Sequence, residues 1–327
     1  MQHDRAAVLQ AVVLAAACAS GAALAQTASY PTKPVTVVVP LAPGGPVEFE
    51  MRLYMPKMQE LLGQPFITEF KLGAAGTIAG AYVAKAAPDG YTLLTVNNAF
   101  ATFPGLYKNL PFDVVKDFAP VTLMTKRPVV LMTGPSFPPR NFAEYLAYAK
   151  ANPGKINWGT TGAGAGGHLS GSWLHGATNT RITFIHYKGT GDALPDLMSG
   201  RLDVTGVGLG QAMPFIKSGK LRPIVMLADK RSPLLPDLTT VAESAVPGYD
   251  YGSYTGFFAP GATPAAIVNR LNENFVKVLK MPEIRNRLEA DGNEVVGNTP
   301  AQFRQMIVNE TSAWTKVVQE AGITLER

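Results

Sequence analysis

From residue 35 to residue 50 the chain reads VTVVVPLAPGGPVEFE. The run from Val35 to Val39 is apolar apart from Thr36, which predicts a strand buried on both faces of a parallel sheet. A Pro/Gly turn at residues 43–46 follows, and glycine permits the backbone angles of a tight connection. Apolar residues then recur at roughly helical spacing up to Leu62. The stretch therefore predicts a strand, a turn and a helix.

The turn at residues 43–46 has two interpretations. Free N–H groups at a helix N-terminus, with the positive end of the helix dipole behind them, attract a carboxylate or a phosphate. However, every α/β protein contains several turns of this kind, and most of them hold no ligand. The turn alone leaves both interpretations open.

The alternation of strands and helices continues along the chain. Further strands are predicted at residues 65–70, 91–96, 181–187, 202–207 and 221–228, with helices or Gly-rich turns between them. Extended segments at 118–124 and 128–133 suit a crossover followed by the first strand of another sheet, and residues 254–259 suit a return strand. This order is typical of α/β folds with parallel sheets, in which ligands bind at the carboxyl ends of the strands.

The length of the chain indicates two domains or one large one. We expect residues 26–126 and 249–327 to form domain 1 and residues 127–248 to form domain 2.

The N-terminus has the pattern of a secretory signal peptide. Arg5 precedes an apolar run at residues 6–19, and small residues lead to Ala25, after which we expect cleavage. The run is too short to span a bilayer, so the mature chain is predicted to be exported to the periplasm and soluble. An alternative, a lipid anchor on Cys18, lacks the bulky residue expected three positions upstream. Because Cys18 is the only cysteine, the predicted mature chain excludes disulfides and thiolate chemistry.

Charge argues against a nucleic-acid partner. The formal net charge is +5, and the 29 Lys and Arg residues are scattered along the chain. A mild basic excess suits an anionic ligand.

The sequence GAGAGG at residues 162–167 fits the dinucleotide fingerprint GxGxxG. That fingerprint also needs an acidic residue after the next strand, which here ends in Tyr-Lys-Gly at 187–189. NAD binding is therefore disfavoured, and no cofactor is expected. Two interpretations remain: a cradle of backbone N–H groups helped by Thr160 and Thr161, which would hold an anion, or a flexible surface loop.

The histidines of the mature chain are His168, His175 and His186. Isolated histidines usually pack or cap, and no spacing here suits a metal site. His168 with a nearby Ser or Thr is the starting point of a hydrolase alternative, but no GxSxG elbow accompanies it. We therefore expect neither catalytic residues nor a metal.

Acidic and aromatic residues follow the first turn. At a helix start Glu48 and Glu50 gain from the dipole, and Glu48 could also orient loop amides or accept a donor from a ligand. Several aromatic residues fall near the predicted strand ends and either stack on a ligand or pack in the core: Phe49, Phe100, Phe103, Tyr251 and Tyr254.

From about residue 30 to the C-terminus the chain resembles the periplasmic substrate-binding proteins of tripartite tricarboxylate transporters, the Bug-type receptors. The motifs that carry the resemblance are YPxKP at 30–34, PGG at 43–45, LGQP at 62–65, GAAGTI at 73–78, AKAAPDGYTLL at 84–94, YKG at 187–189, GKLRP at 219–223 and GFFAP at 256–260.

The resemblance implies a type II periplasmic binding protein. Such a protein has two α/β domains joined by two crossover strands, with a ligand cleft between them. It also implies a small carboxylate as ligand, held by loop amides and waters rather than by an Arg clamp. The predicted ligand-binding residues are Gly44, Gly45, Pro46, Val47, Glu48, Phe49, Asn97, Asn98, Phe100, Thr160, Thr161, Gly164, Ala165, Gly166, His168, Tyr187, Lys188 and Asp203.

The ligand and the partner are further expectations. Val47-Glu48 stands where the family usually has Thr-Asp. With the aromatic residues nearby, this favours an aromatic dicarboxylate such as terephthalate over citrate. The resemblance implies a non-enzymatic, monomeric receptor that delivers its ligand to integral membrane transporter subunits. The alternatives are a ligand-sensing partner of a two-component sensor and an exported hydrolase.

Overall fold

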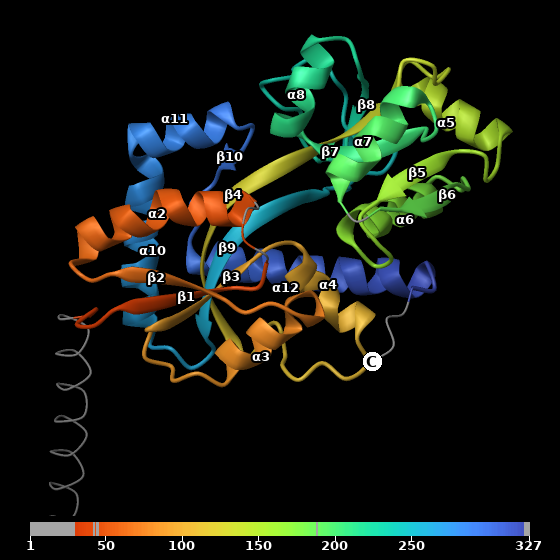
Figure 1. The fold of residues 1–327 in the computed structure, drawn as a ribbon. Helices are drawn as coiled ribbons and strands as arrows, with labels where there is room; N and C mark the ends of the chain where they lie inside the picture. The colour runs from red at the N-terminus through yellow and green to blue at the C-terminus, as the bar shows by residue number, and fades with distance from the viewer. Residues whose placement is uncertain (1–29, 42, 44–45, 188, 324–327) are drawn as a thin grey trace, which may run out of the picture.

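The computed structural model describes residues 30–41, 43, 46–187 and 189–323, so the predicted signal peptide lies outside the described residues. Two α/β domains are joined by the strands β4 (Phe118–Thr133) and β9 (Gly252–Pro260), which run side by side from one domain to the other (Figure 1). Within this part of the chain the strand order is β2-β1-β3-β9-β4-β7-β5-β6, and β8 and β10 also pair with β4.

Domain 1 contains the strand predicted from the opening stretch. Strand β1 (Val35–Val39) lies between β2 (Phe66–Phe70) and β3 (Thr92–Val96) and is parallel to both. All of its residues are buried except Thr36, which is half-buried. Helix α2 (Pro46–Leu62) follows the turn and packs its methionines and Tyr54 into the same core. The apolar run thus forms the central parallel strand that it predicts.

Most other elements of domain 1 agree with the sequence prediction, but the helices α4 (Ala99–Leu106) and α11 (Pro282–Ala290) and the short strand β10 (Glu294–Val295) are absent from it. Pro at the first position of α11 is a usable start signal. Helix α4 contains Pro104 and has no side-chain cap, so its sequence gives no such signal. Among the described residues no helix is long and apolar enough to span a bilayer. The other elements of domain 1, apart from those already named, are η1 (Ala74–Gly76), α3 (Thr77–Ala84), α10 (Ala265–Lys280) and α12 (Pro300–Glu320).

Strand β4 is continuous where the sequence predicts two separate segments. It pairs with β9 from Phe118 to Pro128 and with β7 and β8 from Val129 onward. The polar residues Lys126 and Arg127 interrupt the apolar pattern, yet their backbones pair with β9. The change of partner lies close to the expected boundary at residues 126 and 127. The domain boundaries themselves stay a prediction.

Domain 2 repeats the parallel arrangement around its own core. Strand β5 pairs in parallel with β6 and β7, and its residue Trp158 is fully buried in the same core as Tyr145 of α5. Its elements are α5 (Phe142–Ala151), β5 (Asn157–Thr160), α6 (Gly166–Ala177), β6 (Thr183–His186), α7 (Thr190–Ser199), β7 (Val204–Gly208), α8 (Leu209–Lys217), β8 (Arg222–Met226) and α9 (Val241–Ser244).

Candidate functional site

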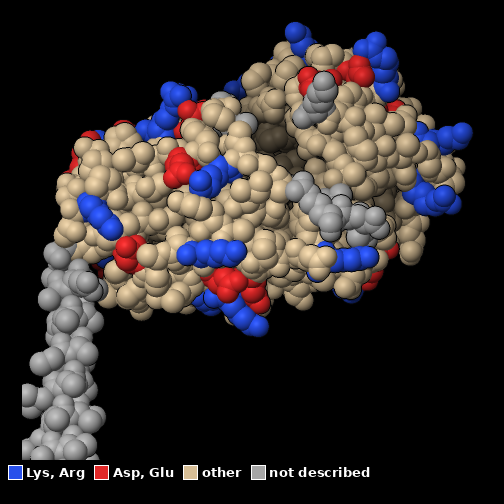
Figure 2. Space-filling model, turned by 60° about the horizontal axis from the view of Figure 1, so that its bottom comes forward, with Lys and Arg blue, Asp and Glu red and all other residues tan. Residues whose placement is uncertain are grey.

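A cavity of about 330 Å³ lies between the two domains. Figure 2 shows the hollow, whose visible walls carry neither basic nor acidic side chains. Residues on both domains line it: Leu41, Val47, Asn97, Arg127, Val129, Trp158, Gly159, Thr160, Thr161, Gly167, Gly189, Thr190, Ala193, Thr205, Gly206, Gly208, Gln211, Leu227, Tyr251 and Ser253.

The carboxyl ends of strands supply much of the lining. Asn97 follows β3, Thr160 ends β5, and Gly208 ends β7. The start of α2 contributes Val47, and the start of α6 contributes Gly167. Leu41 and Val47, which flank the first predicted turn, therefore line one shared cavity with Thr160, Thr161 and Gly167 of the second, as expected for ligand sites in open α/β sheets.

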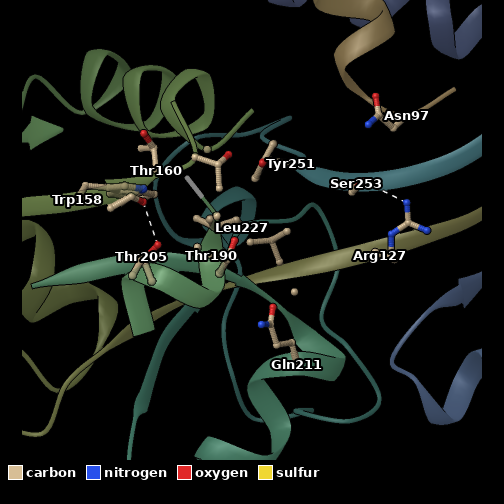
Figure 3. Close-up of a pocket in the computed structure, with 18 of the residues that line it drawn as sticks. Asn97, Arg127, Trp158, Thr160, Thr190, Thr205, Gln211, Leu227, Tyr251 and Ser253 are labelled. Atoms are coloured by element: carbon tan, nitrogen blue, oxygen red, sulfur yellow. Dashed lines mark hydrogen bonds between the residues drawn. The ribbon is translucent and has the colours of Figure 1, made fainter. Parts of the chain in front are cut away.

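The cavity offers uncharged donors against apolar walls. Hydroxyl and amide side chains project from both sides, and Figure 3 shows Asn97 and Ser253 across the cavity from Thr160 and Thr205. Glycines in the lining leave the backbone uncovered by side chains at the cavity surface: Gly159, Gly167, Gly189, Gly206 and Gly208. Among the described residues that line the cavity, Arg127 alone carries a charge. The lining therefore contains no described Asp or Glu that would repel an anion.

Arg127 is not free to act as a clamp, because Glu50 neutralises it. The Glu50 carboxylate is 1% exposed and forms an ion pair with the guanidinium. It also accepts hydrogen bonds from Tyr54 at 2.9 Å and from Thr125 at 2.8 Å. Arg127 donates further to Ser253 and to the Tyr254 carbonyl oxygen at 3.2 and 2.9 Å. Through these bonds Arg127 of β4 joins β9 and helix α2 at the place where the two strands pass from one domain to the other.

Hydrogen bonds within domain 2 orient the threonine side chains on its side of the cavity. The Thr205 hydroxyl donates to the Gly159 carbonyl oxygen at 2.9 Å, and Thr160 Oγ1 lies 2.6 Å from Nδ1 of His186. A Cβ on Gly159 would lie 2.6 Å from Cδ2 of Leu202, so a side chain at this position would require Leu202 to shift. The fully buried Trp158 has an indole N–H with no acceptor among the described residues.

Tyr251 brings the two domains into contact at the edge of the cavity. A Cβ on Gly166 would lie 2.7 Å from the Tyr251 hydroxyl and 3.0 Å from Nδ2 of Asn98. Burial raises the pKa of Tyr251 to about 12, although its hydrogen bond with Asn98 acts in the opposite direction. The phenol therefore stays protonated at neutral pH and can donate.

Val47, Asn97, Thr160 and Thr161 are the predicted binding residues that the structure places in the cavity wall. Asn98 and Gly166 lie beside Tyr251 at its edge. Pro46 and Ala165 stand at the starts of α2 and α6. Gly44, Gly45 and Lys188 lie outside the described residues.

Other predicted binding residues have contacts elsewhere. Phe100 is 3% exposed and packs among the aromatic rings of domain 1. Glu48 pairs with Arg52 at 2.6 Å, as a helix-stabilising residue does. Phe49 lines an adjoining hollow, with the guanidinium of Arg287 5.2 Å from its ring centre. These side chains do not line the cavity.

Domain 2 holds the remaining predicted residues. Tyr187 donates to Asp196 at 2.9 Å, and the Asp203 carboxylate accepts from the Asn157 backbone N–H at 2.7 Å. Nδ1 of His168 accepts from the Gly164 N–H at 3.0 Å. Asp203 directly precedes β7 and so lies at the end opposite the cavity.

The histidines occupy structural positions. Burial lowers the pKa of His175 to about 4, and its ring lies between Tyr145 at 2.9 Å and Thr180 at 2.6 Å. Ser170, the serine that lies two residues after His168, is fully buried, and its Oγ is 2.6 Å from the Tyr249 hydroxyl. This geometry gives no support to a His168–Ser170 pair.

The prediction missed several residues of the cavity wall. Gln211 and Thr190 lie in the first turns of helices that follow strands, so the strand-end rule could have found them. Arg127 is a cation within an apolar strand, which is itself a signal. Trp158 and Leu227 carry no such signal, because they are apolar residues of the domain 2 core, and an apolar residue in the sequence predicts burial and not a cavity wall.

Comparison with known proteins decides the family. Residues 51–323 match the sequence profile described as "Tripartite tricarboxylate transporter family receptor". The chain belongs to this receptor family. The protein BugT of Bordetella pertussis is 31% identical over 300 residues, which are 91% of this chain and 92% of BugT. Members of the family are periplasmic solute-binding receptors, and they work with membrane transporter components.

Two solved structures resemble this receptor in fold and sequence. The R. palustris protein Rpa4515, solved with adipate, superposes with a TM-score of 0.76 at 33% identity and covers 90% of this chain and 100% of its own. MatC from Rhodopseudomonas palustris with bound malate has a TM-score of 0.71 at 36% identity, covering 88% of this chain and 100% of its own. The two-domain fold predicted from the resemblance is therefore confirmed.

Proposed function

We propose that this chain is a periplasmic receptor that binds a small dicarboxylate in the cavity between its domains and delivers it to a membrane transporter. The observation that carries the proposal is the cavity lining: N–H and O–H donors on both domains, one neutralised Arg, and no described acidic side chain. Oriented amides and hydroxyls stabilise a carboxylate that has left water. The relatives solved with adipate and malate support this class of ligand.

The walls favour a ligand with an apolar body. Val129, Trp158 and Leu227 line the cavity, and Figure 3 shows Leu227 between Thr205 on one side and Ser253 on the other. An aromatic or long aliphatic dicarboxylate would bury its carbon skeleton there, whereas citrate would place a further carboxylate and a hydroxyl against the same surface. We therefore rank terephthalate and adipate above citrate. Phe100 is left out of the proposed site.

A ligand panel tests the proposal. Purified protein is titrated with terephthalate, adipate, malate and citrate while its thermal unfolding is followed. A ligand present at about a hundredfold excess over its Kd should stabilise the protein by about 2.7 kcal/mol. The absence of stabilisation by every carboxylate would overturn the proposal.

Export and delivery are parts of the same proposal with separate tests. We propose cleavage after Ala25, which the N-terminal sequence of protein purified from the periplasm would check. Loss of uptake of the bound dicarboxylate in cells lacking the gene would support delivery to a transporter. Unchanged uptake with a lost transcriptional response would instead indicate a sensor partner.

A further inference from the structure

The two domains touch each other on both sides of the linking strands β4 and β9 (Figure 1). On one side, helix α6 of domain 2 packs against α12 of domain 1. Leu169 and Trp314 belong to one apolar cluster there, and the ring centre of Trp173 lies 5.5 Å from that of Trp314. Because water is excluded from these large apolar side chains, we expect this contact to hold whether or not a ligand is bound.

On the other side, the start of α8 in domain 2 meets the turn after α11 in domain 1 through main-chain atoms. A Cβ on Gly210 would overlap the Asp291 carbonyl oxygen, and a Cβ on Gly292 would lie 2.7 Å from the backbone nitrogen of Gly210. Neither position leaves room for another carbon atom. The two backbones therefore come this close only because both residues are glycine. We call the meeting of Gly210 with Asp291 and Gly292 the glycine contact.

Each side of the glycine contact is fixed within its own domain. The Gly292 N–H donates to the Glu289 carbonyl oxygen at 3.0 Å, and the strand β10 that follows pairs with β4. Helix α8 directly follows β7, which pairs with β4 and β5. A side chain added at the contact would therefore push the two domains apart rather than displace one loop.

The glycine contact contributes little attraction of its own. Among the described residues, no hydrogen bond or ion pair joins the start of α8 to residues 290–293. It permits a close approach without enforcing it. The force that holds the domains together on this side therefore has to come from what lies between them.

The glycine contact borders the main cavity. Gly210 stands between Gly208 and Gln211, which both line that cavity. The hollow around the contact shares Arg127, Gly208 and Gln211 with the main cavity. A movement of α8 away from α11 would therefore carry Gly208 and Gln211 away from a bound ligand.

We propose that Gly210 and Gly292 are positioning residues that set the affinity for the dicarboxylate, although neither belongs to the described cavity lining. They allow α8 to close against α11, while the contact between α6 and α12 stays in place on the other side. A larger residue at either glycine would stop this closure short. The inference rests on the proposed function, because it concerns the affinity of the same cavity.

The first test is Gly210→Ala, with Gly176→Ala as its matched control. Both glycines lie in helices of domain 2, where alanine is favoured, but a Cβ on Gly176 would meet nothing within 4 Å. Calorimetric titration with adipate and terephthalate gives the affinities. Gly210→Ala should bind about tenfold more weakly than the parent, because the apparent Kd rises as the closed fraction falls. Gly176→Ala should bind like the parent.

The second test is Gly292→Asn, which approaches the contact from domain 1 and keeps the inference testable if Gly210→Ala does not fold. Gly292 has a φ of 76°, a backbone angle that asparagine tolerates better than most residues. Gly63→Asn is the matched control, because Gly63 follows α2 with a φ of 72° and a Cβ there would meet nothing within 4 Å. Gly292→Asn should weaken binding and Gly63→Asn should not.

A distance measurement detects closure independently of affinity. Spin labels on Lys217→Cys of α8 and Asn286→Cys of α11, both exposed positions, report the separation of the two helices by double electron–electron resonance. Cys18 lies in the predicted signal peptide and adds no label to the mature chain. The parent should show a short-distance population that the dicarboxylate increases. Both contact variants should lack this population, and both controls should keep it.

The inference is overturned if the parent never shows the short distance, if both contact variants keep it, or if the controls lose it equally. Unchanged affinity in variants that have lost the short distance would also overturn it. Unfolding of both contact variants would do the same, because the contact would then serve folding. If the parent binds neither acid, the proposed function fails, and the distances alone decide whether the two glycines permit closure.

Discussion

Two cavities lie beside the linking strands, the main one and a second of about 570 Å³, and Tyr251 and Ser253 line both, but the two linings differ in charge. The main cavity has one cation, Arg127, and Glu50 already neutralises it, so hydroxyl, amide and backbone donors remain for a ligand. The described lining of the second cavity carries five acidic and four basic side chains, among them Lys126 and Asp250, whose charged atoms lie 3.0 Å apart. The difference teaches that a site for an anion needs donors without competing carboxylates, a condition that the described lining of the main cavity meets and that of the second cavity does not.

The largest expected effect concerns the ion pair that separates the two environments. Arg127→Met leaves the Glu50 carboxylate buried without its partner, which should cost about 3–5 kcal/mol of unfolding free energy. Urea denaturation measures the loss. The double variant Arg127→Met with Glu50→Gln should recover part of it. A loss below about 1 kcal/mol in the single variant would show that the pair contributes little to holding α2, β4 and β9 together.

A carboxylate placed in the main cavity should make it resemble the second one. Asn97→Asp keeps the oxygen that accepts the Ala99 N–H at 3.1 Å, so the start of α4 is preserved. Repulsion by the new charge should weaken dicarboxylate binding by about 100-fold. Asn309→Asp, at an exposed position on α12, is the control. Equal affinities for the two variants would place the ligand away from Asn97.

The pH dependence of unfolding free energy tests Glu310, a buried carboxyl group that lines the second cavity. Burial raises the pKa of Glu310 from 4.5 to about 7. The folded state therefore holds this proton more tightly than the unfolded chain, and its stabilising contribution is lost as the pH rises from about 4.5 to 7.

Glu310→Gln should remove that loss, so the variant should gain about 1–3 kcal/mol on the parent between pH 5 and pH 8. Urea denaturation of both proteins at each pH provides the values. His175 changes in the opposite sense below its ordinary pKa, so only the difference between variant and parent is informative. A constant difference across this range would contradict the prediction.

The smallest expected effect is the loss of one hydroxyl from the main cavity. Thr161→Val removes a donor at the exposed mouth and should weaken dicarboxylate binding by about five- to tenfold. Thr183→Val removes a hydroxyl from the exposed strand β6. This hydroxyl donates to the Gly154 carbonyl oxygen at 2.9 Å and does not line the cavity, so the variant should keep its affinity for the dicarboxylate. Identical losses would indicate an effect on the domain rather than on the site.

Local chemistry accounts for what the sequence predicts correctly. Val35–Val39 is the buried parallel strand, and Asn97 and Thr160 reach the cavity because they stand at strand ends. Long-range packing accounts for the rest. Phe100 belongs to an aromatic core assembled from segments far apart in the chain. Glu50 lies two residues after Glu48 in the sequence. It nevertheless bonds to Arg127, which lies 77 residues further along the chain.

Calorimetric titration of the purified protein and its Asn97→Asp variant with terephthalate and adipate tests the central claim most directly. We predict saturable binding of one dicarboxylate per chain by the parent and its loss in the variant, with the fold of both proteins intact. Absence of binding by the parent, or undiminished binding by the variant, would contradict a carboxylate held by uncharged donors between the two domains.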